Sequence, residues 1–109
     1  SVYETVKMNL ANGLHTLILL DLDKEKNSFL KPGEALSRLL AIFEEMGDDE
    51  VNEEREAVVC VKLGSDESKI YYGKIKELLK IQTVPAVIVI PGKLHFTEKE
   101  YLQIVGNKP

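Results

Sequence analysis

Apolar and polar positions along the chain alternate between two periods, one typical of helices and one of buried strands. Val2, Val6 and Leu10 lie four residues apart and Gly13 follows soon after, so the chain is predicted to begin with a helix that ends near this glycine. The next stretch, LHTLILLDL at 14–22, is too continuously apolar for a strand with one solvated face. It predicts a strand buried on both faces.

A second helix is predicted to start near Pro32 and to end before Gly47. Four apolar residues share one face of it, and we expect this face to pack into the core: Leu36, Leu39, Leu40 and Phe43. The acidic stretch DDEVNEERE at 48–56 follows. A metal site could be imagined there, but such a run is typical of a solvated linker.

The second half of the chain alternates in the same way. A buried strand is predicted at 57–63, before the turn-forming Gly64-Ser65-Asp66. Residues 69–80 mix two patterns, and we expect a short edge strand that changes to a helix near Tyr72-Gly73. The apolar run at 86–90 predicts another buried strand.

The last helix is predicted from its first turn. Thr97 and Glu100 have the spacing of a capping box, with Thr97 as the N-cap. Phe96 and Tyr101 then have the spacing of a hydrophobic staple. The segment between the preceding strand and Phe96 is therefore expected to be a connection that sets the angle of this helix.

This order of elements predicts an α/β fold. We expect a single small domain of 109 residues, with a mixed β-sheet of about four to five strands flanked by about four helices. Ligands of such sheets tend to bind beyond the carboxyl ends of strands. Three such ends are predicted here, at residues 21–23, 63–65 and 90–92.

Composition narrows the possible partners. The net charge of −4 gives no support for a broad basic surface that binds nucleic acid, and no apolar run approaches the length of about 20 residues that a membrane-spanning helix needs. Cys60 is the only cysteine. It is expected in the core, and the absence of a possible internal disulfide favours a reducing, cytoplasmic setting. The chain begins without Met, and we expect it to be part of a longer protein.

Motifs for nucleotide binding and for nucleophilic catalysis are missing. The segment at 91–94 lacks the first glycine, the spacing and the hydroxyl of a phosphate-binding P-loop, and the chain has no GxGxxG. His15 or His95 could be combined with Ser65 and Asp21, but no nucleophile elbow is present. His15 is expected to be structural, with its ring hydrogen-bonded to backbone, and His95 to be a turn or rim residue. We predict no catalytic side chain and no metal ligand.

A thioredoxin-like domain is one alternative. Val84-Pro85 before an apolar strand and the glycine turn after it resemble that fold. Thioredoxin chemistry needs a CxxC pair, which this chain lacks. A non-catalytic binding module of thioredoxin-like shape therefore stays possible, and a matching strand order with a cis peptide bond before Pro85 would support it.

Longer segments resemble a known family. They are NLANGLHTLILLD at 9–21, LGS at 63–65, KIYYGKI at 69–75 and PGKLHF at 91–96, followed by Glu98 and by Glu100-Tyr101-Leu102. Together and in this order they are similar to the carboxyl-terminal half of diphthine synthases, which are relatives of the tetrapyrrole methylases. The similarity extends over nearly the whole chain.

The resemblance implies an S-adenosylmethionine-dependent methyltransferase. Its substrate would be elongation factor 2, whose modified histidine is methylated on the route to diphthamide. The cofactor would lie in a cleft between this domain and an amino-terminal domain that is absent here, so the fragment alone is expected to be inactive. The family is commonly homodimeric. A second alternative is half of a tetrapyrrole-type methyltransferase with a small-molecule substrate.

The resemblance also implies three cofactor contacts from this half: Leu20, Leu63 and Ala86. Each lies at the end or the start of a predicted strand, and backbone atoms are expected to make most of the contacts. Many family members have Pro-Pro-His or Pro-Leu-His where this chain has Val84-Pro85-Ala86, so an imidazole contact is lost here. Ser68 likewise replaces a frequent Gln.

Overall fold

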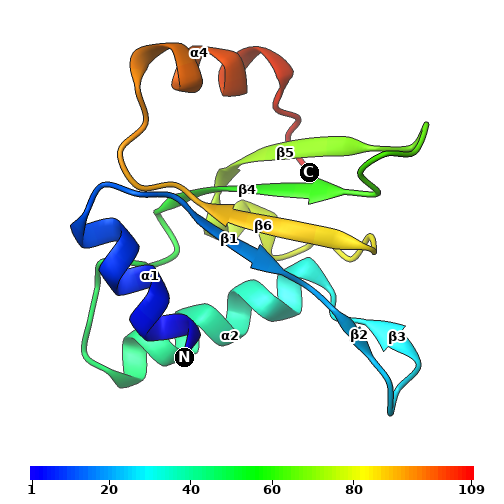
Figure 1. Cartoon of the computed structure of the whole chain (residues 1–109), viewed down its shortest axis with the longest axis horizontal. Helices are drawn as coiled ribbons and strands as arrows, with labels where there is room; N and C mark the ends of the chain where they lie inside the picture. Colours follow the sequence, from blue (N-terminus) through cyan, green and yellow to red (C-terminus); the bar gives the residue numbers. More distant parts are fainter.

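The computed structural model describes all 109 residues as four helices and two β-sheets (Figure 1). Its elements, in chain order, are α1 (Val2–Ala11), β1 (Thr16–Leu19), β2 (Leu22–Asp23), β3 (Ser28–Phe29), α2 (Pro32–Glu45), β4 (Glu56–Val61), β5 (Lys69–Lys74), α3 (Ile75–Leu78), β6 (Ala86–Ile90) and α4 (Phe96–Val105). The predicted α/β class is therefore confirmed.

The main sheet has four strands in the order β1-β6-β4-β5, and all neighbouring strands are antiparallel. The expectation of a mixed sheet was wrong in this respect. The predicted strand at 14–22 is also divided: β1 ends at Leu19, and β2 pairs with β3 in a separate hairpin. Alternating helices and strands do not by themselves fix the strand direction, because antiparallel neighbours need no crossover helix between them.

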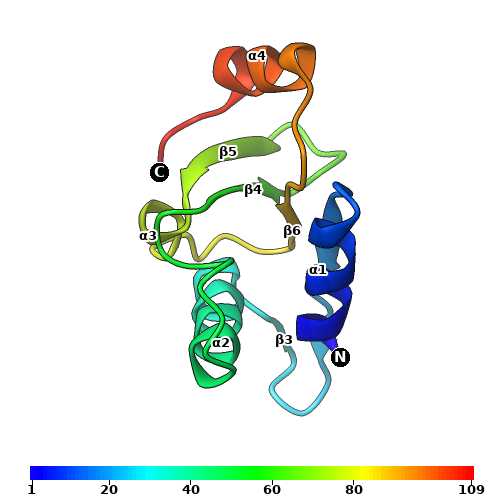
Figure 2. The ribbon, with the colours of Figure 1, turned by 90° about the vertical axis from the view of Figure 1, so that its left-hand side faces the viewer.

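One face of the main sheet holds the hydrophobic core. Side chains of this inward face pack against α1, α2 and α3. The ribbon shows α2 below the strands of the sheet and α4 above them (Figure 2). Each of the three helices contributes fully buried side chains: Val6 from α1, Leu36 and Phe43 from α2, and Ile75 and Leu78 from α3. The strands contribute Ala57, Val59, Val61, Ala86, Ile88 and Ile90, and Leu20 joins them just after the end of β1. At about 25 cal/mol per Å² of apolar surface removed from water, this layer is the main source of stability.

The first two helices confirm their predicted positions. Pro32 stands in the first turn of α2, where its missing N–H costs nothing. Gly47 has φ +66 just past the end of α2, a backbone conformation that glycine adopts without steric cost. In the mixed region, the change from strand to helix lies between Lys74 and Ile75, slightly later than predicted.

The last helix starts at a different residue from the one predicted. Its N-cap is His95, and Glu98 is at N3, where its Oε1 accepts a hydrogen bond from the His95 N–H at 3.0 Å. Phe96 is therefore the first residue of α4, and it is 80% exposed. The prediction of Thr97 as N-cap and Phe96 as a staple was wrong. Both His95 with Glu98 and Thr97 with Glu100 have the spacing of a capping box. The first pair forms the cap, and Glu98 also contacts His15, a distant residue that sequence spacing does not reveal.

The chain after α4 returns to the sheet and covers the β5 edge. Tyr72 N–H donates to the Asn107 carbonyl at 3.1 Å, and Asn107 N–H donates to the Ile70 carbonyl at 2.8 Å. Unpaired edge groups invite pairing with other chains, so this segment protects one edge of the sheet. No helix of the protein is long and apolar enough to cross a membrane.

Candidate functional site

The residues predicted to contact a cofactor lie at one end of the main sheet, where β1 and β4 finish and β6 begins. This end is called the cofactor edge below. Val61 pairs with Ala86 in the register of β4 and β6, and Leu19 pairs with Val87 in that of β1 and β6. Leu20 therefore lies beside Ala86 in the next row. Leu63 follows Val61 by two residues, so the fold brings Leu20, Leu63 and Ala86 to the same edge.

The three side chains differ in exposure. Leu20 and Ala86 are each only 6% exposed and belong to the core. Leu63 is 60% exposed. A ligand at this edge could thus touch the Leu63 side chain directly, but it would meet Leu20 and Ala86 mainly through backbone atoms.

The backbone before Leu63 is held in an uncommon conformation. Lys62 has φ +51, which is costly for a residue with a side chain. Three hydrogen bonds fix it: its N–H donates to the Pro85 carbonyl at 2.8 Å, and its own carbonyl accepts from the N–H and the hydroxyl of Ser65 at 3.1 and 2.8 Å. The turn directs the chain out of β4 and leaves Leu63 at the surface.

A shallow pocket of about 120 Å³ opens at this edge. It is lined by Cys60, Leu63, Pro85, Ala86 and Val87. The lining is apolar apart from the thiol and backbone groups. Sites that bury a whole small-molecule ligand usually have about 300–1,000 Å³, so this pocket can hold only part of a ligand the size of adenosylmethionine.

Because β6 runs antiparallel to β1 and β4, its carboxyl end lies at the other end of the strands, away from the cofactor edge. The three predicted strand ends therefore do not converge. At this second edge, His15 Nδ1 accepts a hydrogen bond from the Gly92 N–H at 2.9 Å, and His15 Nε2 lies 3.2 Å from Glu98 Oε2. The prediction of a structural His15 bonded to backbone is confirmed, although its partner is 77 residues away.

Glu98 joins this edge to α4. It accepts from the His95 N–H and faces the His15 ring, and these two contacts hold the pKa of its carboxyl below the usual value. A groove of about 410 Å³ lies between α4 and the sheet beside this pair, lined by His15, Val58, Val89, Pro91, Leu94, Thr97, Glu98, Tyr101 and Leu102. His95 itself caps the helix, as a turn residue.

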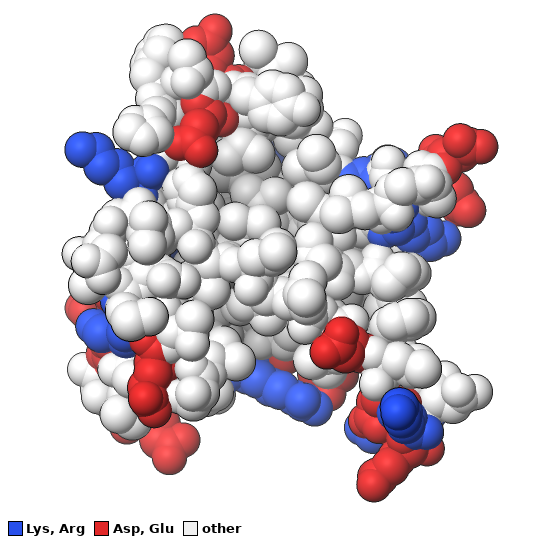
Figure 3. Space-filling view, viewed as in Figure 1, with Lys and Arg blue, Asp and Glu red and all other residues white.

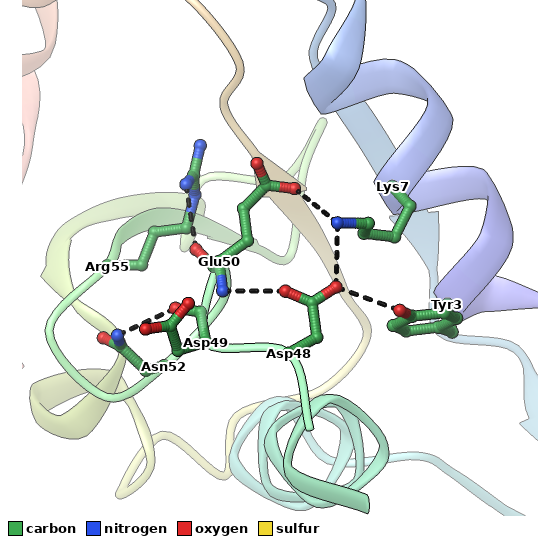
Figure 4. A network of polar contacts seen from close by, with 7 residues as sticks. All are labelled: Tyr3, Lys7, Asp48, Asp49, Glu50, Asn52 and Arg55. Carbon is green, nitrogen blue, oxygen red and sulfur yellow. Dashed lines mark hydrogen bonds and ion pairs between the residues drawn. The ribbon is translucent and has the colours of Figure 1, made fainter. Parts of the chain in front are cut away.

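The acidic linker is part of a structural network rather than a cluster of free carboxylates (Figure 4). Asp48 accepts from the Tyr3 hydroxyl at 2.9 Å and forms an ion pair with Lys7 at 2.9 Å. The ammonium of Lys7, the Glu50 N–H and the Tyr3 hydroxyl lower the pKa of the Asp48 carboxyl. No group of three or more His, Cys, Asp or Glu side chains is placed to hold a metal ion.

Cys60 is not in the core as predicted. It is half-buried on the face of the sheet opposite α2, and its partners in the neighbouring strands are Val87 and Ile70. Desolvation raises the pKa of its thiol, so it is less reactive than a free cysteine. The Lys62 conformation and the contact between His15 and Glu98 have no signal in the local sequence, because both depend on segments that are distant in the chain.

The chain is similar to diphthine synthases in sequence. It is 41% identical over 103 residues to the diphthine synthase of Methanococcus maripaludis strain C5, with 93% of this chain and 40% of the relative covered. The enzyme of Methanocaldococcus jannaschii is 40% identical over 105 residues, with 93% and 41% covered. The chain thus spans about two fifths of the length of these curated relatives. No protein-family model matches it.

Solved structures give the same result. A structure from Entamoeba histolytica, provisionally described as a diphthine synthase, matches the whole chain with a TM-score of 0.89 at 26% identity and is 46% covered. A further diphthine synthase crystal structure matches 97% of the chain with a TM-score of 0.78 at 28% identity and is 40% covered. By sequence and by fold, the domain is homologous to the diphthine synthases and corresponds to about two fifths of their length.

Proposed function

We propose that this domain forms one wall of the cofactor cleft of an S-adenosylmethionine-dependent methyltransferase. The longer protein would methylate the modified histidine of elongation factor 2 in diphthamide biosynthesis. The homology to diphthine synthases supports this activity. The observation that carries the cofactor part is that Leu20, Leu63 and Ala86 lie at the same end of the main sheet, where Leu63 and Ala86 line one pocket.

The pocket at the cofactor edge is suited to the adenosine part of the cofactor. Leu63 and the backbone around Pro85 and Ala86 offer an apolar surface of the kind that an adenine ring or a ribose face can pack on. No charged side chain lines this pocket, so the charged aminocarboxyl part of the cofactor would need partners elsewhere. We assign those partners to the amino-terminal domain, which we propose completes the cleft.

Adenosylmethionine, when bound, supplies an electrophilic methyl group on a sulfonium. The transfer of this group needs positioning of donor and acceptor and a dry site rather than a nucleophilic side chain or a metal. The rigid turn at Lys62 would hold Leu63 against the cofactor and keep water away from it. This division of roles explains why the domain can contribute to catalysis without a catalytic residue of its own.

Two alternatives remain as proposals. A tetrapyrrole-type methyltransferase with a small-molecule substrate would use the same edge and would differ in the amino-terminal domain. A thioredoxin-like binding module is supported only by the cis peptide bond between Val84 and Pro85, while the similarity in sequence favours the methyltransferase. The single cysteine leads us to propose a cytoplasmic protein, and the family resemblance leads us to propose a homodimer.

Calorimetry tests the shared cleft. Adenosylhomocysteine is titrated into this domain and into a full-length protein that contains it, and we expect at least about tenfold weaker binding to the domain. Equal affinities would contradict a cleft shared between two domains. In the full-length protein, Leu63→Asp is expected to weaken binding, whereas Met46→Asp, at the far end of α2, should leave it unchanged.

Transfer of a labelled methyl group tests the substrate. Elongation factor 2 that carries the aminocarboxypropyl histidine is the acceptor, and the same factor without this group is the control. We expect label only in the modified factor and only with the full-length protein. Failure of the full-length protein to methylate it would reject the assigned substrate, even if the cofactor binds.

A further inference from the structure

Leu63 is held differently from the rest of the pocket at the cofactor edge. The other four lining residues lie in strands or directly before one: Cys60 in β4, Ala86 and Val87 in β6, and Pro85 just before β6. The pairing of β4 with β6 fixes the places of these four. Leu63 lies beyond the end of β4 and is 60% exposed, so neither strand pairing nor core packing holds its side chain.

The residues on both sides of Leu63 have a left-handed backbone. Lys62 has φ +51 and Gly64 has φ +84. Glycine adopts such a conformation without steric cost, whereas lysine adopts it only where surrounding contacts impose it. A Cβ added at Gly64 would meet no atom within 4 Å, so glycine is needed there for its φ rather than for space. The direction of the Leu63 side chain therefore depends on the contacts that stabilise Lys62.

Ser65 supplies most of these contacts. Its N–H and its hydroxyl both donate to the Lys62 carbonyl, at 3.1 and 2.8 Å. The same hydroxyl oxygen accepts from the Glu67 N–H at 3.2 Å, and the Ser65 carbonyl accepts from the Ser68 N–H at 3.2 Å. On the other side of the turn, the Lys62 N–H donates to the Pro85 carbonyl at 2.8 Å. Ser65 is thus the residue through which the loop after β4 holds Lys62.

The ion pair in the same loop contributes less. Lys62 Nζ lies 3.3 Å from Glu67 Oε2, but the Glu67 side chain is 77% exposed. Water and salt screen such pairs, and most of them add little to stability. The space-filling view shows acidic and basic side chains together at the outer end of the loop between β4 and β5, at the upper right, beside an uncharged surface over the strands (Figure 3). The Ser65 hydroxyl, rather than this ion pair, is the side-chain contact that holds the turn.

We propose that Ser65 is a positioning residue of the cofactor site: its hydroxyl holds the turn at Lys62, and the turn fixes the Leu63 side chain at the pocket. The proposal rests on the proposed function, because it takes the ligand of this pocket to be adenosylmethionine or its product adenosylhomocysteine. Ser65 does not line the pocket and acts through Leu63. A surface that already has its binding conformation loses less conformational entropy when a ligand binds, so release of the turn lowers affinity although every lining residue is still present.

Amide hydrogen exchange of the 109-residue chain tests the turn without any cofactor. Ser65→Ala removes the hydroxyl, and we expect the Lys62 amide to exchange about 3- to 10-fold faster, as the loss of one hydrogen bond predicts. The amide of Val59, inside β4, should be unchanged. Ser65→Thr keeps the hydroxyl and should restore the slow exchange. Ser68→Ala, at an exposed position of the same loop, is the matched control and should behave as the wild type. A Lys62 amide that is unchanged in Ser65→Ala would overturn the proposal.

Calorimetry of adenosylhomocysteine binding to the full-length protein tests the positioning role. We expect Ser65→Ala to bind about 3- to 10-fold more weakly than the wild type, and Ser65→Thr and Ser68→Ala to bind as the wild type does. If the wild type binds and Ser65→Ala binds equally well, the positioning role is rejected and the proposed function is intact. A lower Tm of Ser65→Ala with unchanged affinity would make Ser65 purely structural and would reject the role as well. A wild-type protein without binding would reject the proposed function, and this role with it.

Two changes at Lys62 separate the backbone conformation from the charge. Lys62→Asn and Lys62→Val both remove the ammonium and its ion pair with Glu67. Asparagine tolerates the left-handed conformation, whereas valine, which is β-branched, does not. Lys62→Val should therefore bind adenosylhomocysteine about tenfold more weakly than Lys62→Asn in the full-length protein. Equal affinities of the two variants would show that the turn does not set the affinity, and would overturn the proposal.

Discussion

The two faces of the main sheet are built from the same kinds of residue and differ in what covers them. Ile88 and Val59 point inward and are sealed by three helices. Leu17 and Leu19, in the edge strand, point outward and are more than half exposed. The comparison shows that aliphatic residues can occupy both faces of a strand although this domain fully covers only one of them.

The difference between the faces predicts unequal costs for similar changes. Ile88 is 1% exposed, and Ile88→Ala should lower the free energy of unfolding by about 2–5 kcal/mol because it leaves a cavity. Leu17→Ala should cost less than about 0.5 kcal/mol in dilute protein. Urea denaturation measures both losses in the free energy of unfolding. Equal losses would mean that the outward face is already buried within one chain.

Gly33 in α2 lies so close to the backbone of Leu79 that replacing it with alanine should destabilise the protein. A Cβ added at Gly33 would lie 1.9 Å from the Leu79 carbonyl oxygen. Gly33→Ala should therefore lower stability by about 1–3 kcal/mol, although alanine favours helices over glycine. Ser37→Ala, exposed on the same helix, is the control and should gain a few tenths of a kcal/mol. Thermal unfolding distinguishes the two, and a stabilised Gly33→Ala variant would contradict the packing of α2 on α3.

The contacts of Asp48 in the acidic linker with Tyr3 and Lys7 of α1 should stabilise the protein in a pH-dependent way. The pKa of Asp48 is lowered in the folded protein, so its contribution to stability is present above the ordinary carboxyl pKa and is lost as the pH falls through the lowered value. Asp48→Asn should reduce Tm at pH 7, and this difference should shrink below about pH 4. Asp49→Asn, whose side chain makes no contact to α1, should have little effect at either pH. A difference that persists unchanged at pH 2 would reject the ionic basis.

The smallest effect is expected at α4, the partial cover of the outward face. Glu98→Gln should weaken the contacts to His15 and His95, because a neutral amide is a poorer acceptor than a carboxylate. The amide protons of α4 should then exchange faster while those of β6 stay unchanged. Glu100→Gln, exposed on the same helix, serves as the matched control. Unchanged exchange in α4 would show that the pair does not hold this helix.

The local spacing of apolar residues predicted most of the helices and strands. It failed where contacts between distant segments decide where a helix starts or how strands pair. The face of α2 and the buried run at 86–90 follow directly from apolar spacing. The start of α4 depends on His15, which lies 83 residues before Glu98, and two plausible capping frames could not be separated without it. The antiparallel order of the sheet is likewise a property of topology that alternating helices and strands did not reveal.

The candidate site was predicted only in part, for a similar reason. Resemblance selected Leu20, Leu63 and Ala86, and the strand register brings them to one edge. The positive φ of Lys62, which leaves Leu63 exposed, depends on a hydrogen bond to the carbonyl of Pro85, which lies just before β6. Exposure of the outward face had no signal in the sequence, since an apolar run is the same whether its cover belongs to the domain or to a partner.

The most direct test of the difference between the two faces is methyl NMR with a soluble nitroxide, which broadens the signals of solvent-exposed groups. We predict strong broadening of the Leu17 and Leu19 methyl signals and little broadening of those of Ile88, as their exposures require. Leu17 and Leu19 signals that are as well protected as those of Ile88 would contradict a second sheet face that this domain leaves partly uncovered.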